Sequence, residues 1–322
     1  MENIVCNLCG NNKVLPFYQY VPDYLLNNDK IKVNFVKCTS CGLIYQNPRP
    51  TLEEMSEHYP ENYESYTYDD ELDNSSILLK TVYQYGINKR IRFVTHFKKH
   101  GRLLDLGCST GIFLNGFKGS PNWNLFGVEI NKKAALIAQN KGLNVFTGTL
   151  EEANFPNEYF DVVTMWDVLE HLHDPASSLK EIYRILKPDG ILVIRVPNEN
   201  SWDAHIFGRY WSGLDAPRHL FIFTPITLNR MLSVQNFETI MHSSQIGAYT
   251  TFLLSVRFWK QAKHDNNLLI NFIVNFLYHP IMRLITAPFF YLSGLGLKGP
   301  LLVTVAKKRM ENFNDRNTSL EC

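Results

Sequence analysis

Four of the six cysteines form two closely spaced pairs near the N-terminus, Cys6-x-x-Cys9 and Cys38-x-x-Cys41. A glycine follows each pair and lets the chain turn tightly enough for both sulfurs to face one point. Two such turns would together offer four thiolates in the tetrahedral arrangement that zinc takes in closed, structural sites. We therefore predict a structural zinc ion bound by Cys6, Cys9, Cys38 and Cys41. The alternative is four unrelated buried thiols.

A strand, a glycine-containing loop and a helix are predicted in succession from residue 102. Residues 103–106 are apolar around Asp105, and residues 107–111 form the loop. This order is the first half of a nucleotide-binding unit. Gly107 and Gly111 are four positions apart, so the G-x-G-x-x-G register of dinucleotide enzymes cannot be written here, which disfavours a nicotinamide oxidoreductase. Asp105 at the loop mouth would repel a pyrophosphate but suits an ammonium group.

A second acidic residue, Glu129, ends the next predicted strand, residues 125–128, 24 positions after Asp105. An acid at this place can accept hydrogen bonds from the two hydroxyls of a ribose. The pattern therefore predicts a ligand that contains a nucleoside. The alternative is an exposed acid at a strand end.

These residues resemble the class I S-adenosylmethionine-dependent methyltransferases, whose motifs look like residues 104–111, 127–129, 147–151, 160–171 and 186–194, in that order. The resemblance implies an α/β fold: a Rossmann-like, mostly parallel sheet of seven strands with helices on both faces. It implies S-adenosylmethionine as cofactor. Many members carry Asp where this chain has Thr149, so the adenine would contact the Thr149 hydroxyl, or Leu150 and Glu151. The cofactor contacts implied are Asp105, Gly107, Cys108, Ser109, Gly111, Glu129, Ile130, Thr149, Leu150, Trp166 and Asp167.

Two histidines are candidates for the general base that a hydroxyl or carbon acceptor would need. His171 follows the fourth predicted strand, where acceptor and cofactor meet in this fold, and His219 lies in an aromatic segment after the fifth. Each has a structural alternative. His171 could order its loop by a hydrogen bond to a neighbouring strand. Arg218 and Asp215 could simply pair, with His219 capping the helix that begins at Thr224.

The cysteine pairs, with residues 45–50 and 216–224, look like a narrower branch of the family: methyltransferases that carry a zinc ribbon and act on sugars or surface polysaccharides. This resemblance implies methylation of a small molecule, a sugar or nucleotide sugar, and Arg218 would suit a phosphorylated acceptor. O-methylation of a quinone or other lipid-like aromatic is the alternative. A non-catalytic module that binds S-adenosylmethionine or recruits a partner is a third reading.

The fold should finish with an antiparallel pair of strands, residues 237–242 and 301–306, separated by a hydrophobic helical insertion at about 250–298. Within it, residues 266–282 are 17 positions without a formal charge, and their polar residues recur every fourth position. A helix with so narrow a polar stripe needs apolar surroundings. A buried core helix, a homodimer interface and a peripheral membrane helix all fit this pattern.

Three regions are expected along the chain: a zinc ribbon at 1–50, an acidic, tyrosine-rich lid with a leading helix at 51–100, and the methyltransferase domain at 101–322. From residue 51 to 73 there are nine acidic residues and no Lys or Arg. Tyrosines interleaved there could cover a cationic ligand. The alternative is a solvated acidic face with tyrosines packed on the next domain. The tyrosines concerned are Tyr59, Tyr63, Tyr66 and Tyr68.

Composition narrows the class of protein further. Hydrophobic residues at 45% and charged residues at 20% are ordinary globular values and exclude a coiled coil, a collagen or wholesale disorder. A net charge of +1 is too small for broad binding of nucleic acid. The N-terminus lacks the basic start and apolar core of a secretory signal, which predicts a cytoplasmic protein. It would be peripheral to the membrane if the insertion binds lipid.

Overall fold

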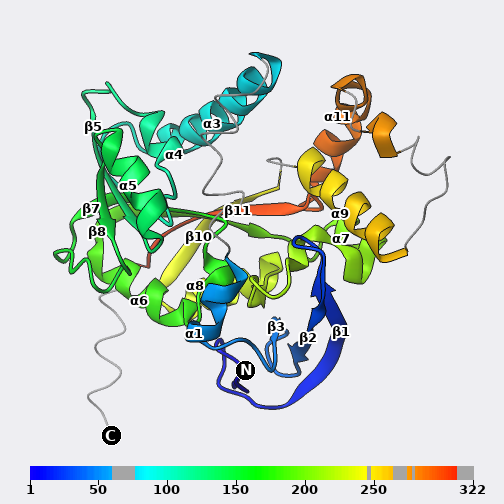
Figure 1. Cartoon of the computed structure of the whole chain (residues 1–322). Helices are drawn as coiled ribbons and strands as arrows, with labels where there is room; N and C mark the ends of the chain where they lie inside the picture. The colour runs from blue at the N-terminus through cyan, green and yellow to red at the C-terminus, as the bar shows by residue number, and fades with distance from the viewer. Residues whose placement is uncertain (60–76, 245–247, 264–273, 278–279, 310–322) are drawn as a thin grey trace, which may run out of the picture.

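The computed structural model describes residues 1–59, 77–244, 248–263, 274–277 and 280–309 of the 322-residue chain (Figure 1). Its centre is a seven-stranded sheet with the order β10-β11-β8-β7-β4-β5-β6. The strands are β4 (Gly101–Leu106), β5 (Trp123–Glu129), β6 (Asn144–Thr147), β7 (Phe160–Trp166), β8 (Leu186–Pro197), β10 (Phe237–Ser243) and β11 (Leu301–Lys308).

The sheet is parallel from β8 to β6, and β11 runs antiparallel to both β8 and β10. The predicted seven-stranded α/β sheet is therefore confirmed, as is the predicted closing antiparallel pair. The last strand in sequence, β11, lies between β10 and β8, and residues 244–300 connect β10 to β11 outside the sheet. Because the first residue of β11, Leu301, pairs with the last residue of β8, Pro197, the insertion is connected at the carboxyl end of β8.

Apolar side chains cover both faces of the sheet. Leu103 and Leu104 are consecutive on β4 and both fully buried, but they belong to two different hydrophobic clusters. Neighbouring residues on a strand point to opposite faces, so each cluster fills the space between one face and its helices. The helices are α3 (Ile77–Phe97), α4 (Ile112–Asn115), α5 (Lys132–Asn140), α6 (Pro175–Ile185) and α8 (Pro225–Val234).

The N-terminal segment builds a second, four-stranded sheet in the order β1-β2-β3-β9. The strands are β1 (Val14–Asp23), β2 (Asn28–Cys38), β3 (Ile44–Gln46) and β9 (Phe221–Ile222). Its fourth strand thus comes from the methyltransferase region, and Leu43 and Tyr45 join the same hydrophobic cluster as Leu104. Strand pairing and core packing both cross the predicted boundary at residue 50, so a bound metal would not be the sole source of stability for this segment.

Two helices of the insertion, α9 (Ala248–Lys263) and α11 (Pro280–Leu295), pack together at the end of the molecule away from α5 and α6 (Figure 1). The Phe290 ring lies 5.6 Å from that of Tyr249 and 5.5 Å from that of Phe252. Residues 264–273 and 278–279, which include ten of the 17 positions of the predicted uncharged stretch, lie outside the described residues. Pro280 begins a helix, as proline can at a first helical position. In the described part of the chain, no helix has the length and hydropathy needed to cross a membrane.

Short elements connect these parts: α1 (Leu52–Met55) and η1 (Ser56–His58) before α3, η2 (Leu169–His171) after β7, and α7 (Trp202–Phe207), η3 (Gly208–Tyr210) and η4 (Ser212–Leu214) after β8. Of the predicted tyrosine lid only Tyr59 is described. Tyr63, Tyr66 and Tyr68 lie outside the described residues.

Candidate active site

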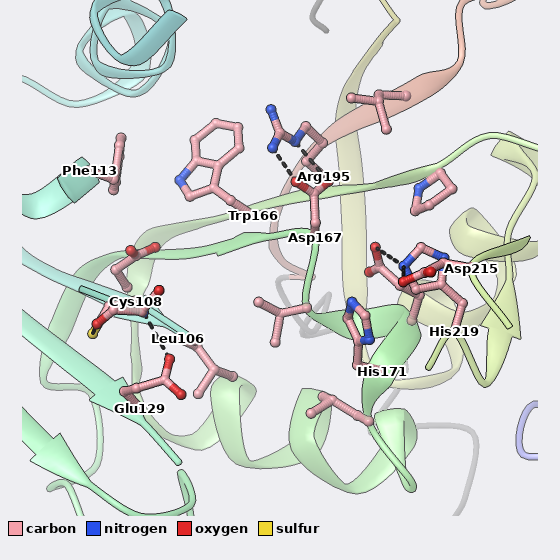
Figure 2. A pocket seen from close by; sticks show the side chains of 18 of the residues that line it. Leu106, Cys108, Phe113, Glu129, Trp166, Asp167, His171, Arg195, Asp215 and His219 are labelled. Atoms are coloured by element: carbon pink, nitrogen blue, oxygen red, sulfur yellow. Dashed lines mark hydrogen bonds and ion pairs between the residues drawn. The ribbon is translucent and has the colours of Figure 1, made fainter. Parts of the chain in front are cut away.

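A cavity of about 1580 Å³ opens at the carboxyl ends of the parallel strands. This is where ligands bind in open α/β sheets. The cavity is long, and Figure 2 shows Cys108 and Glu129 at one end and His171 and His219 at the other. Every predicted cofactor residue except Gly111 lines it, and so do both candidate bases.

Glu129 is held rigidly at the tip of β5. Its Oε2 accepts the backbone N–H of Ser109 at 2.8 Å, and its Oε1 accepts that of Asn131 at 2.8 Å. The side chain is 6% exposed, and burial raises the pKa of its carboxyl although the backbone donors lower it. A carboxylate fixed by two amides and lining the cavity is placed to accept further hydrogen bonds from ligand hydroxyls.

Asp105 is buried more deeply than its position beside the loop suggests. It accepts a hydrogen bond of 2.6 Å from the Thr164 hydroxyl on the neighbouring strand β7. Burial raises the pKa of its carboxyl to about 7, although Thr164 and Arg90 lower it. Asp105 is therefore close to half protonated at neutral pH, and a ligand cation would favour its ionised form.

The two loop glycines, Gly107 and Gly111, both have a positive φ, but they approach different neighbours. Gly107 adopts a φ of +69°, and a Cβ there would lie 2.6 Å from Val168, beside the cavity. Gly111 adopts a φ of +76°, and a Cβ there would lie 2.4 Å from Leu143 on the far side of the loop. Gly111 thus allows the close approach of the loop to Leu143; it does not line the cavity, and its role in cofactor binding stays a prediction.

The remaining predicted residues of the loop and the rim also line the cavity. Cys108 is buried, which raises the pKa of its thiol and keeps it protonated. Ile130 is 63% exposed at the rim, whereas Leu150 is buried. The backbone N–H of Thr149 donates to Glu152 at 2.7 Å, which fixes the turn after β6.

Trp166 and Asp167 end β7 in the middle of the cavity (Figure 2). Arg195, on β8, forms an ion pair with Asp167, with Nε 2.9 Å from Oδ1, and its guanidinium lies 5.6 Å from the Trp166 ring. Burial acts to raise the pKa of Asp167, but the charge of Arg195 holds it below its usual range. Arg195 was missed by sequence reasoning; a single charge inside the apolar run 191–196 was the available signal.

His171 and His219 come from distant parts of the chain and meet with their ring centroids 4.5 Å apart. Nδ1 of His219 lies 2.8 Å from the carbonyl oxygen of Gly213, and Nδ1 of His171 lies 3.1 Å from that of Arg218. A carbonyl oxygen only accepts, so each Nδ1 carries the proton and each Nε2 keeps its lone pair. A hydrogen bond that orders the loop was expected for His171, but its acceptor is in the loop before β9 and not on a neighbouring strand. Tyr59 places its hydroxyl 2.9 Å from the same Nδ1.

Both rings are neutral at physiological pH. Burial lowers the pKa of His219, although Asp215 acts to raise it, and burial lowers that of His171 to about 3. A neutral imidazole with a free lone pair can accept a proton.

Glu170 is a third member of this group that sequence reasoning left without a role. Its side chain is fully buried, and neither carboxylate oxygen has a hydrogen-bond partner among the described residues. Oε1 lies 4.0 Å from Nε2 of His219. Burial and the charge of Asp167 raise the pKa of Glu170 well above its usual value.

Arg218 is not available for an acceptor phosphate. It is fully buried and forms ion pairs with Asp23 on β1 and Asp215, at 2.7 Å each. These carboxylates raise its pKa, although burial acts to lower it. The structure therefore supports the pairing alternative for Arg218. The alternative that His219 caps α8 is wrong, because Thr224 caps it in a reciprocal box with Thr227.

A model of the family described as "Methyltransferase domain" matches residues 80–242. The chain belongs to this family. The matched segment runs from within α3 to within β10 and includes Asp105, Glu129, His171 and His219.

Among curated proteins, the methyltransferase domain is 31% identical over 135 residues to an uncharacterized protein of Methanocaldococcus jannaschii, over 42% of this chain and 60% of that protein. It is 32% identical over 106 residues to a ubiquinone biosynthesis O-methyltransferase of Alkalilimnicola ehrlichii, over 31% of this chain and 42% of that enzyme. The match thus spans about half the length of these relatives. A solved S-adenosylmethionine-dependent methyltransferase of Thermotoga maritima is 18% identical, with a TM-score of 0.49, over 78% of this chain and all of that one.

The four N-terminal cysteines converge beside the methyltransferase domain. Sγ of Cys6 lies 3.4 Å from that of Cys41, Sγ of Cys9 lies 3.5 Å from that of Cys38, and all four sulfurs lie within 4.8 Å of one another. Zinc–sulfur bonds of about 2.3 Å would put tetrahedral sulfurs about 3.8 Å apart. The donor set and spacing therefore fit a structural zinc ion.

Proposed function

We propose that this chain transfers a methyl group from S-adenosylmethionine to a hydroxyl of a small, largely apolar acceptor. One observation carries the proposal. A single cavity joins the Asp105–Glu129 end to the His171–His219 end, so a cofactor held at the first would face an acceptor held at the second. The methyl of a sulfonium is already activated, so alignment and exclusion of water supply most of the rate enhancement.

At the donor end, Glu129 would accept the ribose hydroxyls and Asp105 would face the cationic part of the cofactor. Both carboxylates line the cavity and are fixed by neighbouring donors. Trp166 and Asp167 would separate the two ends, since they lie between them in the cavity (Figure 2).

At the acceptor end, we assign proton removal to Nε2 of His219. Its lone pair is left free by the Nδ1 contact with Gly213, and Oδ2 of Asp215 lies 3.9 Å away, where it would stabilise the imidazolium that forms. His171 would contact the acceptor from the other side. Proton transfer of this kind contributes about 10²–10⁴-fold to rates.

The acceptor end favours an aromatic or lipid-like molecule over a nucleotide sugar. Its described wall under the insertion is aromatic and aliphatic, including Trp211, Tyr249, Leu254 and Phe290. The argument from Arg218 for a phosphorylated acceptor is removed, because two carboxylates neutralise this side chain. Relatives of this chain include proteins named ubiquinone biosynthesis O-methyltransferases, which supports this acceptor class.

Incubation with radiolabelled S-adenosylmethionine and two pools of cell extract, one of lipids and one of nucleotide sugars, tests the acceptor class. We expect label in the lipid pool. Label only in the nucleotide-sugar pool would contradict the proposed lipid-like acceptor and would favour a nucleotide sugar. Calorimetric binding of S-adenosylmethionine with no methyl transfer to any pool would favour a non-catalytic binding module.

We further propose that Cys6, Cys9, Cys38 and Cys41 bind one structural zinc ion. Three of the four are buried, and Cys6, Cys38 and Cys41 belong to the cluster that includes Leu104. Metal analysis of purified protein should find about one thiolate-bound zinc per chain. Removing it should lower the thermal midpoint of the whole molecule, because the core is shared. Zinc-free protein with an unchanged melting curve would contradict this role.

A further inference from the structure

The acceptor end of the cavity contains a buried carboxyl group, that of Glu170, whose two oxygens have no hydrogen-bond partner among the described residues. Three carboxylates lie close to one another there. Arg195 pairs with Asp167 and Arg218 pairs with Asp215, but Glu170 has no hydrogen-bond partner among the described residues. A buried, unpartnered polar group is destabilising and needs a physical reason.

Two histidines lie beside this carboxylate, and Oε1 of Glu170 is 4.0 Å from Nε2 of His219. One ligating atom from each of Glu170, His171 and His219 lies within 4.8 Å of the other two. The one distance known, 4.0 Å between Oε1 of Glu170 and Nε2 of His219, exceeds the roughly 3 Å between neighbouring ligands on an ion with bonds of about 2.1 Å. These two side chains would therefore close by about 1 Å around an ion.

The hydrogen bonds behind the rings are those of metal-binding histidines. Histidines that bind metal usually donate their other ring N–H to a carbonyl or carboxylate, which orients the ring. Nδ1 of His219 does this with the Gly213 carbonyl, and Nδ1 of His171 does it with the Arg218 carbonyl. Both Nε2 lone pairs are thereby left for a ligand.

We propose that Glu170, His171 and His219 bind a divalent first-row transition cation, such as Mn²⁺, at the acceptor end of the cavity. Two imidazoles and one carboxylate are a ligand set that holds such ions on one face and leaves other positions open. The open positions would face the cavity, since all three residues line it. This site is separate from the four-cysteine site in both position and donor type.

The cation would also define the acceptor, a step that rests on the proposed function. Open positions on one face suit an acceptor with two neighbouring oxygen atoms, such as adjacent hydroxyls on a ring. A hydroxyl bound to a divalent cation loses its proton more readily than a free one. With the cation present, the proton would leave to solvent and Nε2 of His219 would act as a ligand instead of as the base.

Titration of the purified, zinc-loaded protein with MnCl₂, followed by the electron paramagnetic resonance signal of free Mn²⁺, tests the site directly. Mn²⁺ prefers oxygen and nitrogen ligands over thiolates, so the cysteine site does not interfere. We expect one Mn²⁺ per chain. Glu170→Gln and His219→Gln should each weaken binding by about tenfold or more. His173→Gln is the matched control, because His173 lies two positions from His171 but contacts the Pro50 carbonyl instead, and it should bind as the wild type does.

Wild-type protein that binds no Mn²⁺ at millimolar concentration would overturn the proposal, whether or not the variants fold. Equal binding by Glu170→Gln and wild type would also overturn it. Calorimetry with S-adenosylmethionine on the same samples separates this result from the proposed function. Cofactor binding without Mn²⁺ binding rejects the metal site alone, whereas Mn²⁺ binding without cofactor binding rejects the methyltransferase assignment alone.

Discussion

The two ends of the cavity are built in different ways. At the donor end, each carboxylate is held by donors close by in the fold: Ser109 and Asn131 for Glu129, and Thr164 for Asp105. At the acceptor end, His171 from the segment after β7 meets His219 from the loop before β9, and the buried Glu170 between them lacks a hydrogen-bond partner among the described residues.

This difference shows which function each end can serve. Carboxylates held by donors on adjacent strands and loops of the central sheet give a rigid site for a constant ligand, here the cofactor. An end assembled from separate segments under an inserted pair of helices can vary with the acceptor. We therefore expect changes at the acceptor end to affect turnover and changes at the donor end to affect cofactor affinity.

The largest effect is expected for His219→Ala. Loss of the Nε2 lone pair, as base or as metal ligand, should lower the single-turnover rate by about 10²–10⁴-fold. The dissociation constant of S-adenosylmethionine, measured by calorimetry, should change by less than about twofold, because His219 lies at the other end of the cavity (Figure 2). Equal losses in rate and cofactor affinity would assign His219 a structural role. They would also contradict the proposal that the acceptor end affects turnover and the donor end affects cofactor affinity.

A smaller effect is expected for Glu129→Gln at the donor end. A hydrogen bond to a charged group contributes about 1.5–3 kcal/mol, so cofactor affinity should fall by about 10–100-fold. The rate at saturating cofactor should change little. Calorimetry followed by single-turnover assays separates the two quantities. Glu238→Gln is the control variant, because it removes a carboxylate from the distant strand β10 and should leave cofactor affinity unchanged. A rate that falls with affinity unchanged would contradict the assignment.

Cofactor affinity should depend on pH through Asp105. Because the pKa of this carboxyl is raised to about 7, the free protein is increasingly protonated below that pH, and a bound cation must displace the proton. Affinity should therefore rise with pH and level off above about pH 7, with a slope of about tenfold per pH unit well below it. Calorimetry from pH 5.5 to 8.5 measures this profile. Asp105→Asn should flatten it; an unchanged profile in that variant would assign the dependence to another group.

The smallest effect is expected for Tyr59→Phe. The hydroxyl of Tyr59 lies 2.9 Å from Nδ1 of His171 and helps to orient the ring. Loss of one neutral hydrogen bond costs about 1 kcal/mol, so turnover should fall by about fivefold while cofactor affinity is retained. A fall in cofactor affinity of the same size would contradict this assignment and would indicate that Tyr59 supports both ends of the cavity.

The donor end was predictable because its residues are close in sequence to the strand that positions them. Asp105 and Glu129 end consecutive parallel strands, and strand ends are readable from apolar runs. Gly111 shows what the motif does not contain. Its place in the motif is fixed by sequence, but only the structure shows that the loop packs against Leu143 and Ala138 at this position.

The acceptor end was predictable only in part. His171 and His219 were candidates by residue type, but nothing in the sequence indicated that their rings meet or that Glu170 lies between them. Arg218 illustrates the limit. Its neighbours in sequence suggested phosphate binding, whereas Asp23, nearly two hundred positions earlier, neutralises it.

The sequence by itself determined the order of strands and helices, the glycine loop, the strand-end acids and the two cysteine pairs, because these depend on local periodicity and spacing. Only the tertiary structure decided that β9 completes the N-terminal sheet, that the insertion forms a wall of the cavity, and that Glu170 lies with two histidines. Contacts between distant segments depend on how the whole core packs, and that information is not local to any stretch of the chain.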